Sequence, residues 1–245
     1  MQPKASLCLV AIYCFFSNLV FSQSVTSDKL LYFNDFDEDT FVAKAVVAEL
    51  SGDKNDIESV QQLNGYGNGQ FSFSGNLVRN ASESQKNDAE DRITFTLTNL
   101  PTHTSISVGF LAGILDSWDD SGTYGPDEFA VEVDGVVVFK EVFSRNPVYS
   151  YQEGSGTATT IYTGDSLGFG RYKDNLWDFF TETQLQNIAH TASTLTVSIY
   201  ATGDGWQGGS DESMAIDNFK ITYQTAPTGN SATIFRIATL TPFFL

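Results

Sequence analysis

The chain has 245 residues, of which 30 are acidic and 13 basic, giving a formal net charge of −17 at pH 7. This negative charge, without a basic cluster to neutralise phosphate, argues against nucleic acid and anionic membranes as partners. It is compatible with cations, a mineral surface or neutral sugars, or with solubility in salty surroundings alone.

Residues 1–22 have the pattern of a secretory signal peptide. Lys4 supplies the positive start, residues 5–21 form the apolar region, and a small serine precedes the predicted cleavage point at Gln23. A membrane anchor is the alternative, but the apolar run is interrupted and shorter than the roughly 20 residues of a spanning helix. Both cysteines lie in this segment, so the processed chain would have neither disulfides nor cysteine-bound zinc. We therefore expect a secreted protein without a membrane span.

Strand-like segments dominate the rest of the chain, most of them with the two-residue alternation of antiparallel strands that bury one face. In chain order these segments are 30–36, 71–73, 93–97, 106–115, 129–133, 195–199 and 219–223. Asp134-Gly135 predicts a tight hairpin between the 129–133 strand and residues 136–139. Residues 178–189 are predicted to form one helix, or a loop over the sheet.

So many short strands predict an all-β fold, an antiparallel two-sheet jelly-roll sandwich. We place this domain at residues 23–224, followed by a tail at 225–245. The apolar end of the tail is too short and broken to be a good membrane or lipid-anchor signal.

An acidic segment follows the 106–115 strand. From Asp116 to Asp134 the chain has seven acidic residues and no basic one, which is costly unless water or a cation screens the charges. Calcium binds six to eight oxygens from carboxylates and loop carbonyls, although the spacing here is not that of an EF-hand. The predicted calcium ligands in this segment are Asp116, Asp119, Asp120 and Asp127. The alternative is a solvated acidic loop.

Two further acidic segments are candidates for the same site. Asp35 and Asp37 end the first strand, where the alternative role of the charge is to protect an edge strand from aggregation. Asp211 and Asp217 lie near the start of the last strand. Asp217 shares the parity of Phe219 and is predicted to point to the same side, where a buried carboxylate needs hydrogen bonds or a metal. Apolar residues of the opposite parity conflict with this, and a bulge near Asp217 would account for either orientation.

Three motifs together resemble a recurrent extracellular module. They are Asp116-Ser117-Trp118-Asp119, the Val-Asp-Gly of Asp127–Gly135, and the Glu-Ser-x-x-Ile-Asp-Asn of Asp211–Ile221. The pattern, which covers most of residues 28–224, resembles extracellular jelly-roll modules of the carbohydrate-binding and concanavalin-like kind.

The chain departs from that family pattern at two places. Asp120 stands where the pattern has Gly, and Met214-Ala215 where it has Trp-Gly, which leaves the ligand contacts in question. In related jelly rolls a structural calcium often joins the first and last strands. The resemblance therefore implies Asp35 or Asp37, together with Asp217, as ligands.

Aromatic residues in or beside predicted loops are candidates for stacking on sugar rings. These are Tyr124, Tyr172, Trp177 and Trp206. Trp118 and Trp206 also follow strand-end motifs, so each is a candidate to plug the end of the sandwich. We favour the plug for Trp118 and leave both roles open for Trp206.

No catalytic motif is evident. His103 and His190 lie in threonine-rich segments without a nucleophile motif, and we expect them to be surface or hydrogen-bonded residues. The clustered Glu-x-Asp-x-x-Glu strand of laminarinase-like sandwiches is absent, although 30 acidic residues leave room for a glycan-cleaving pair. Asn80-Ala81-Ser82 is a glycosylation sequon and predicts a surface loop.

The sequence predicts a monomeric, secreted, non-enzymatic module that is stabilised by calcium and recognises carbohydrate or extracellular matrix. The main alternative is an acidic structural or mineral-associated matrix protein with many weak calcium contacts. A glycan-cleaving enzyme is the third candidate.

Overall fold

Two antiparallel β-sheets build the fold, which confirms the predicted all-β sandwich. The strands of the larger sheet are β1 (Lys29–Asn34), β2 (Thr40–Val42), β4 (Asn55–Ser59), β5 (Asn76–Asn80), β7 (Ser105–Asp116), β10 (Thr159–Thr163), β11 (Asn175–Asp178), β12 (Ile188–Ala189) and β14 (Glu212–Gln224). Those of the smaller sheet are β3 (Val47–Ser51), β6 (Ile93–Thr98), β8 (Asp127–Val133), β9 (Val136–Phe143) and β13 (Thr194–Thr202). The described part of the chain also has three short 3-10 turns, η1 (Gln61–Leu63), η5 (Phe179–Thr181) and η6 (Thr183–Leu185).

This computed structural model describes residues 27–37, 40–52, 55–81, 92–144, 151 and 156–227. The predicted signal peptide and residues 228–245 of the predicted tail lie outside the described residues. Apart from Pro227, the described residues belong to one compact unit, Thr26–Ala226. No helix within these ranges is long and apolar enough to cross a membrane.

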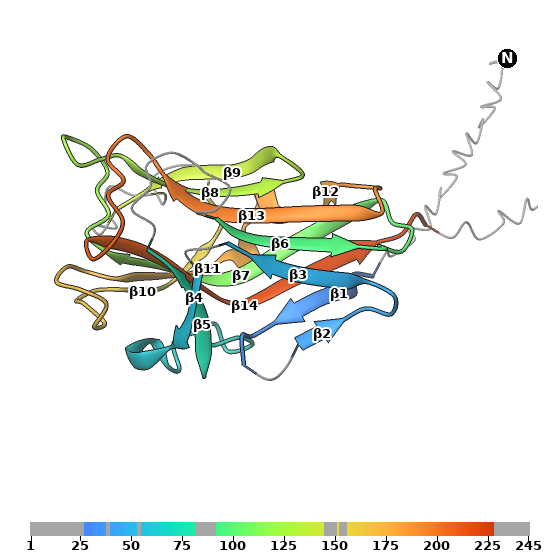
Figure 1. Ribbon diagram of the computed structural model, residues 1–245, viewed down its shortest axis with the longest axis horizontal. Coiled ribbons are helices and arrows are strands. Elements are labelled where there is room, and N and C mark those ends of the chain that lie inside the picture. Colours follow the sequence, from blue (N-terminus) through green and yellow to red (C-terminus); the bar gives the residue numbers. More distant parts are fainter. Residues whose placement is uncertain are drawn as a thin grey trace, which may run out of the picture. The chain divides into compact units, whose positions relative to one another are not determined.

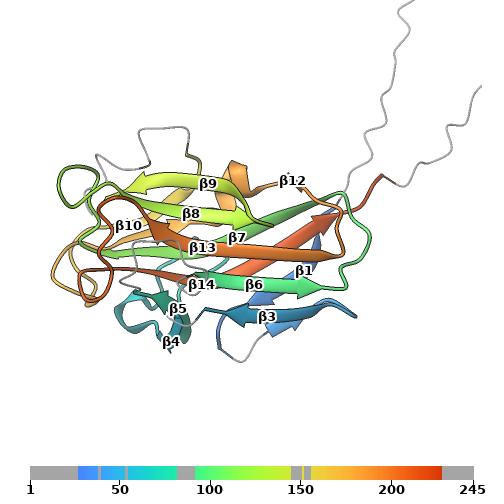
Figure 2. The same cartoon turned by 45° about the horizontal axis from the view of Figure 1, so that its top comes forward.

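The chain passes repeatedly from one sheet to the other, as in a jelly roll. The larger sheet has the order β10-β11-β7-β14-β1-β2, with β4, β5 and β12 joined at its sides, and the smaller sheet the order β3-β6-β13-β8-β9. The smaller sheet lies over the larger one (Figures 1 and 2). The loops that follow β7, β10 and β13 gather at one end of the sandwich, at the left in Figure 1.

The main core lies between the sheets and follows from the alternation of the strands. In β6, Ile93, Phe95 and Leu97 are buried while the intervening threonines are partly exposed. Phe95 stacks on Phe219 of the opposite sheet, with ring centroids 3.7 Å apart. A second apolar cluster on the outer face of the larger sheet places Leu111 and other residues of β7, β11 and β14 under the segment that follows β4.

Three local predictions have different outcomes. Asp134 and Gly135 both have positive φ, 49° and 80°, and join β8 to β9, which confirms the predicted hairpin. The segment 71–73 is not a regular strand, because only an isolated bridge joins Gly67 to Ser72. Residues 178–189 do not form one helix: Asp178 ends β11, and η5, η6 and β12 follow, which is closer to the predicted alternative of a loop. The side chains of Asp178 and Glu182 cap the two short turns by accepting from the amides of Phe180 and Gln184.

The predicted bulge in the last strand is present. The pairing of β14 with β7 shifts between Asp217 and Lys220, where Asn218 has φ 54°. The extra residue reverses the side-chain phase, so that both Ile216 and Phe219 face the main core. Asp217 therefore lies on the outer side of the sheet, and the prediction that it points to the same side as Phe219 is wrong.

Candidate metal site

Three carboxylates converge at the loop end of the sandwich. Asp119 lies in the loop after β7, Asp127 begins β8 and Glu212 begins β14. One oxygen from each residue lies within 4.8 Å of the other two. We call these three residues the acidic cluster. Asp119 and Asp127 were predicted as calcium ligands, whereas Glu212 was not.

Backbone hydrogen bonds fix the loop that carries Asp119. The amide of Asp127 donates to the carbonyl oxygen of Asp119 at 2.8 Å, and the amide of Asp119 donates to Oδ2 of Asp127 at 2.6 Å. The loop between β13 and β14 packs directly on this one. A Cβ atom on Gly205 would lie 2.2 Å from the amide nitrogen of Gly125, so this close approach of two backbones requires glycine.

The cluster has too few donors for its oxygens. Oε2 of Glu212 accepts from the amides of Gln207 and Gly208, at 2.8 and 3.4 Å. Oδ1 of Asp127 and Oε1 of Glu212 are buried and accept from no N–H donor among the described residues, so that either a proton shared between the two carboxyls or a cation is needed to satisfy them. Because a buried carboxylate oxygen without a partner is costly, the cluster has the chemistry of a cation site.

Burial is the main cause of the raised pKa values in the cluster. Burial, together with the charges of Glu212 and Asp119, raises the pKa of Asp127 to about 8, although the hydrogen bond from Asp119 opposes the shift. Burial raises the pKa of Glu212 to about 7, with further contributions from the charges of Asp211 and Asp119. Both groups therefore hold protons near neutral pH unless a cation replaces them.

Glu182 shows that burial alone does not make such a site. It is also fully buried, but its carboxylate accepts hydrogen bonds from the Tyr151 hydroxyl and from the amides of Thr157, Ala158 and Gln184. Burial would raise the pKa of Glu182, yet these bonds outweigh it and the pKa is lowered. The acidic cluster differs from Glu182 in its shortage of donors.

Two buried tryptophans, one of them next to Asp119 in the chain, pack together in the main core. Trp118 and Trp206 are 0% and 1% exposed and meet edge to face, with ring centroids 5.0 Å apart. Nε1 of Trp118 donates to the carbonyl oxygen of Ser213 at 2.9 Å. The plug predicted for Trp118 is confirmed, and Trp206 has the same role.

The predicted sugar-stacking role is therefore wrong for two of the four residues. Trp206 and Trp177 are fully buried and present no ring face to a ligand, because each packs in the main core. Tyr124 and Tyr172 are 61% and 38% exposed and lie on loops at the same end as the cluster.

Asp116 is not in the acidic cluster. Its Oδ1 accepts from the amides of Arg171 and Tyr172, at 3.1 and 2.7 Å, and its own amide donates to Asp174 at 2.8 Å. It therefore anchors the loop between β10 and β11. Asp120, which accepts from the Ser121 hydroxyl, also lies outside the cluster.

The other predicted ligands lie elsewhere or at the margin. Asp211 is next to Glu212 and raises its pKa, but is not part of the cluster. Asp217 is 0% exposed and accepts from the amides of Ser74 and Asn218 at 3.1 and 2.6 Å. Burial, together with the charges of Asp35 and Asp37, raises the pKa of Asp217 to about 8.

A single site for all the predicted ligands is thus wrong. β1 and β14 are neighbours as the prediction required, but Asn34 pairs with Phe219, whereas Glu212 pairs with Asp116 at the other end of β14. Asp37 is engaged by the backbone and side-chain amides of Asn76, at 2.8 and 3.0 Å. Within the described ranges, only the acidic cluster has three carboxylates at metal-binding spacing.

The three remaining residues that carry a prediction from the sequence are Asn80, His103 and His190, and all three are buried in the fold. Asn80 is 2% exposed and ends strand β5, so the sequon does not lie on a surface loop as predicted; the strand pairs with β14 and β4. His103 and His190 are buried, with Nε2 of the first 2.5 Å from Nδ1 of the second. His190 Nε2 lies 2.9 Å from Asp134, so both histidines are hydrogen-bonded, one of the two alternatives expected.

No protein-family model matches the chain, and no curated protein matches it. Among solved structures, the Agl-KA catalytic domain aligns with 86% of this chain at 15% identity and a TM-score of 0.32, and the chain spans 30% of that structure's length. A cleaved adhesin domain of Lys-gingipain from Porphyromonas gingivalis aligns with 77% of this chain and 95% of its own, at 14% identity and a TM-score of 0.31. A carbohydrate-binding module specific for non-crystalline cellulose, CBM28, aligns with 73% of this chain and 87% of its own, at 10% identity and a TM-score of 0.29. Likenesses this remote carry no argument about ligand or activity.

Proposed function

We propose that this chain is an extracellular, calcium-stabilised binding module that recognises carbohydrate or another matrix component. The observation that carries the proposal is the pair of buried carboxylate oxygens, Asp127 Oδ1 and Glu212 Oε1, that accept from no N–H donor in the described structure. One carboxylate oxygen from each of these residues and one from Asp119 lie within 4.8 Å of one another, which is within reach of one cation.

Calcium fits this donor set better than other common metals. The cluster consists of carboxylates alone, and hard oxygen ligands favour calcium, magnesium or manganese over zinc and copper. Its ligands come from a loop and the starts of two strands. Calcium accepts irregular coordination, whereas magnesium requires a near-ideal octahedron and keeps much of its water.

The burial of the cluster favours a stabilising role over catalysis. Asp127 and Glu212 are 0% and 1% exposed, so a polymeric substrate has no access to them. Their raised pKa values have a structural cause in burial and mutual repulsion. The exposed rings of Tyr124 and Tyr172 on the neighbouring loops suit ligand binding next to a fixed loop end.

The proposed secretion rests on the predicted signal peptide at residues 1–22. Sites in extracellular modules commonly bind calcium with dissociation constants of about 0.1–1 mM. A site of this strength would be filled outside the cell and is consistent with the proposed location.

Calcium titration calorimetry tests the proposal on the wild-type protein and three variants. We expect one site that is lost in Asp127→Asn and in Glu212→Gln and kept in Asp120→Asn, which removes a charge from the same loop outside the cluster. Many weak contacts, equally insensitive to all three substitutions, would instead support the acidic matrix protein. Retention of the wild type on a polysaccharide panel tests the carbohydrate part.

A further inference from the structure

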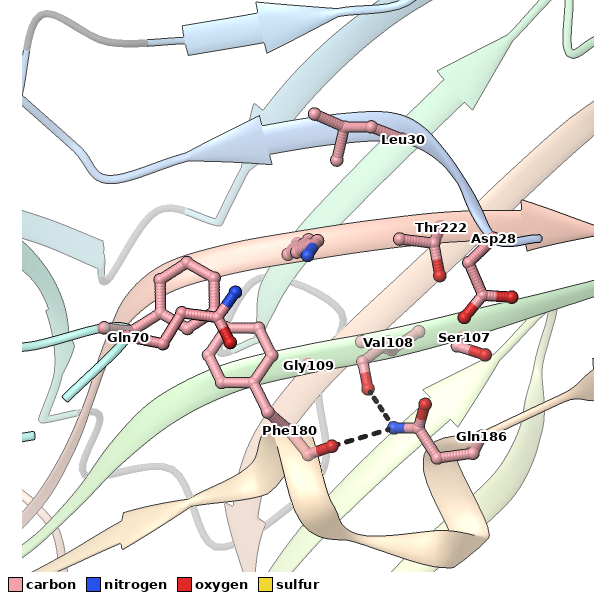
Figure 3. Close-up of a pocket in the computed structure, with 11 residues that line it drawn as sticks. Asp28, Leu30, Gln70, Ser107, Val108, Gly109, Phe180, Gln186 and Thr222 are labelled. Atoms are coloured by element: carbon pink, nitrogen blue, oxygen red, sulfur yellow. Dashed lines mark hydrogen bonds between the residues drawn. The ribbon is translucent and has the colours of Figure 1, made fainter. Parts of the chain in front are cut away.

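A groove of about 370 Å³ crosses the outer face of the larger sheet, away from the acidic cluster (Figure 3). Its floor is formed by β7 and β14, where Gly109 pairs with Lys220 and Ser107 pairs with Thr222. Val108 faces the main core, so its neighbours in β7 point outward. No functional role was predicted from the sequence for any of these residues.

Two aromatic rings form one wall of the groove. Phe71 and Phe180 stack with centroids 4.2 Å apart and an interplanar angle of 15°, and both are partly exposed. Phe180 lies directly over Gly109, where a Cβ atom would be 2.3 Å from its ring. Glycine at this floor position therefore lets the aromatic wall lie close to the sheet.

Polar side chains line the remainder of the groove. The ammonium of Lys220 lies 5.5 Å from the centre of the Phe71 ring. The amide of Gln186 donates to the carbonyl oxygens of Val108 and Phe180, at 3.3 and 3.5 Å, which fixes its orientation (Figure 3). Gln70 lies at the aromatic end and Asp28 at the opposite end, so the polar groups are distributed along the length of the groove.

We propose that this groove binds a segment of an uncharged polysaccharide chain, which rests on the binding half of the proposed function and gives it a site. Sugar rings present C–H groups on their faces and hydroxyls at their edges. The C–H faces suit the Phe71–Phe180 wall, and the hydroxyls suit the amides, hydroxyls and single charges of the lining. The volume is within the usual range for small-ligand sites.

Other ligand classes fit the groove less well. Phosphate-rich ligands need several cations, whereas the lining offers Lys220 opposed by Asp28. A peptide that adds to a sheet needs a free strand edge, but β7 and β14 pair with other strands on both sides. A lipid chain needs a continuous apolar lining, which the amides and charges interrupt.

The test measures binding of the calcium-loaded protein to soluble neutral polysaccharides (β-glucan, xylan, mannan and starch) by affinity electrophoresis. Thr222→Trp fills the groove without removing a core side chain, and Phe180→Ala and Lys220→Ala remove its wall and its cation. We expect each to weaken binding about tenfold or more. Lys173→Ala removes an exposed lysine outside the groove and is the matched control, whereas Tyr124→Ala and Tyr172→Ala test the alternative binding surface on the loops. Unchanged thermal unfolding and calcium titration show that a variant is folded.

The outcomes separate this inference from the proposed function. Binding that is weakened in the groove variants and kept in Lys173→Ala, Tyr124→Ala and Tyr172→Ala supports the groove over the loop surface. Binding that is lost in the tyrosine variants and kept in Thr222→Trp overturns the groove but leaves a carbohydrate-binding module. No binding to any of these neutral polysaccharides overturns the ligand class, while the calcium site is decided independently by calorimetry.

Discussion

Asp127 and Glu212 lie next to each other although they belong to different sheets, the first at the start of β8 and the second at the start of β14. A cation held by both would tie the two sheets together at their loop end. The same two groups hold protons near neutral pH without a cation, so calcium, protons and stability are linked.

Calcium binding is expected to release protons. The pKa of Asp127 is raised to about 8 and that of Glu212 to about 7, mainly by burial, while calcium requires both groups ionised. At pH 7 we expect the release of about one to two protons per calcium, falling toward zero at pH 9. Calorimetry in PIPES and in Tris, which differ in ionisation enthalpy, measures this number. Identical enthalpies in the two buffers at pH 7 would contradict the assignment of the ligands.

Without calcium, the free energy of unfolding is expected to fall as the pH rises from 5 to 8. The folded-state pKa values of Asp127, Glu212 and Asp217 lie at about 8, 7 and 8, above their ordinary values of 3.8, 4.5 and 3.8. The folded chain therefore holds more protons than the unfolded chain in this interval, and stability is lost as those protons leave. Urea unfolding in EDTA at several pH values checks the slope. Saturating calcium should remove the part due to Asp127 and Glu212 and leave the part due to Asp217; a slope unaffected by calcium would argue against the cluster.

Replacing a carboxylate of the cluster by an amide should raise the free energy of unfolding in EDTA and lower it, relative to the wild type, in calcium. In EDTA at pH 8, Asp127→Asn replaces a buried charge by an amide that can donate to Glu212, and we expect a gain of about 1 kcal/mol or more. In calcium at 100 times its dissociation constant, the wild type gains about 2.7 kcal/mol that the variant lacks. Urea unfolding under both conditions gives the two differences. The exposed-loop control Asp120→Asn should stay within about 0.5 kcal/mol in EDTA.

Replacing Trp206 should cost stability, whereas replacing Tyr124 should not. Trp206 is 1% exposed and packs on Trp118, so Trp206→Ala is expected to destabilise by about 3–5 kcal/mol. Tyr124 is 61% exposed, and Tyr124→Ala is expected to stay within about 0.5 kcal/mol. Thermal unfolding compares the two, and a small effect at Trp206 would contradict its role as a plug.

Asp116→Ala is expected to lower stability without removing the calcium site. Its carboxylate accepts amide hydrogen bonds from Arg171 and Tyr172, and losing them should cost about 2–3 kcal/mol. The calcium stoichiometry, measured on the folded variant at low temperature, should not change. A lost site with unchanged stability would show that Asp116 is a ligand after all.

The central strands of the sandwich could be predicted because their alternation is strong. β6 and β13 alternate apolar residues with threonine and serine, and Asp134-Gly135 marks the hairpin between β8 and β9. β2 is exposed along its whole length, and β3 has only two partly buried side chains, Ala48 and Leu50, so neither strand carries a strong apolar signal. They were not predicted.

Two of the three residues of the acidic cluster were predicted, and Asp116 shows why the prediction also included residues outside the cluster. The density of charge marked the segment containing Asp119 and Asp127, but it does not show which carboxylates have their oxygens occupied by backbone amides. Asp116 does, and Asp127 keeps one oxygen free. Glu212 was not predicted as a ligand, because Asp217 in the same strand was chosen for its alternation with Phe219. The sequence feature that could have indicated Glu212 is its position at the start of the Glu-Ser-x-x-Ile-Asp-Asn motif.

The acidic cluster joins the middle of the chain to its last strand, and this has a kinetic consequence. Glu212 reaches Asp119 and Asp127 only after β14 has docked between β7 and β1, which are distant from it in sequence. Because the cation then acts on contacts made late, it should leave the folding rate nearly unchanged and slow the unfolding rate. If the protein is secreted as proposed, an unfolded chain would be exposed to proteases, and calcium would set the lifetime of the protein more than its yield.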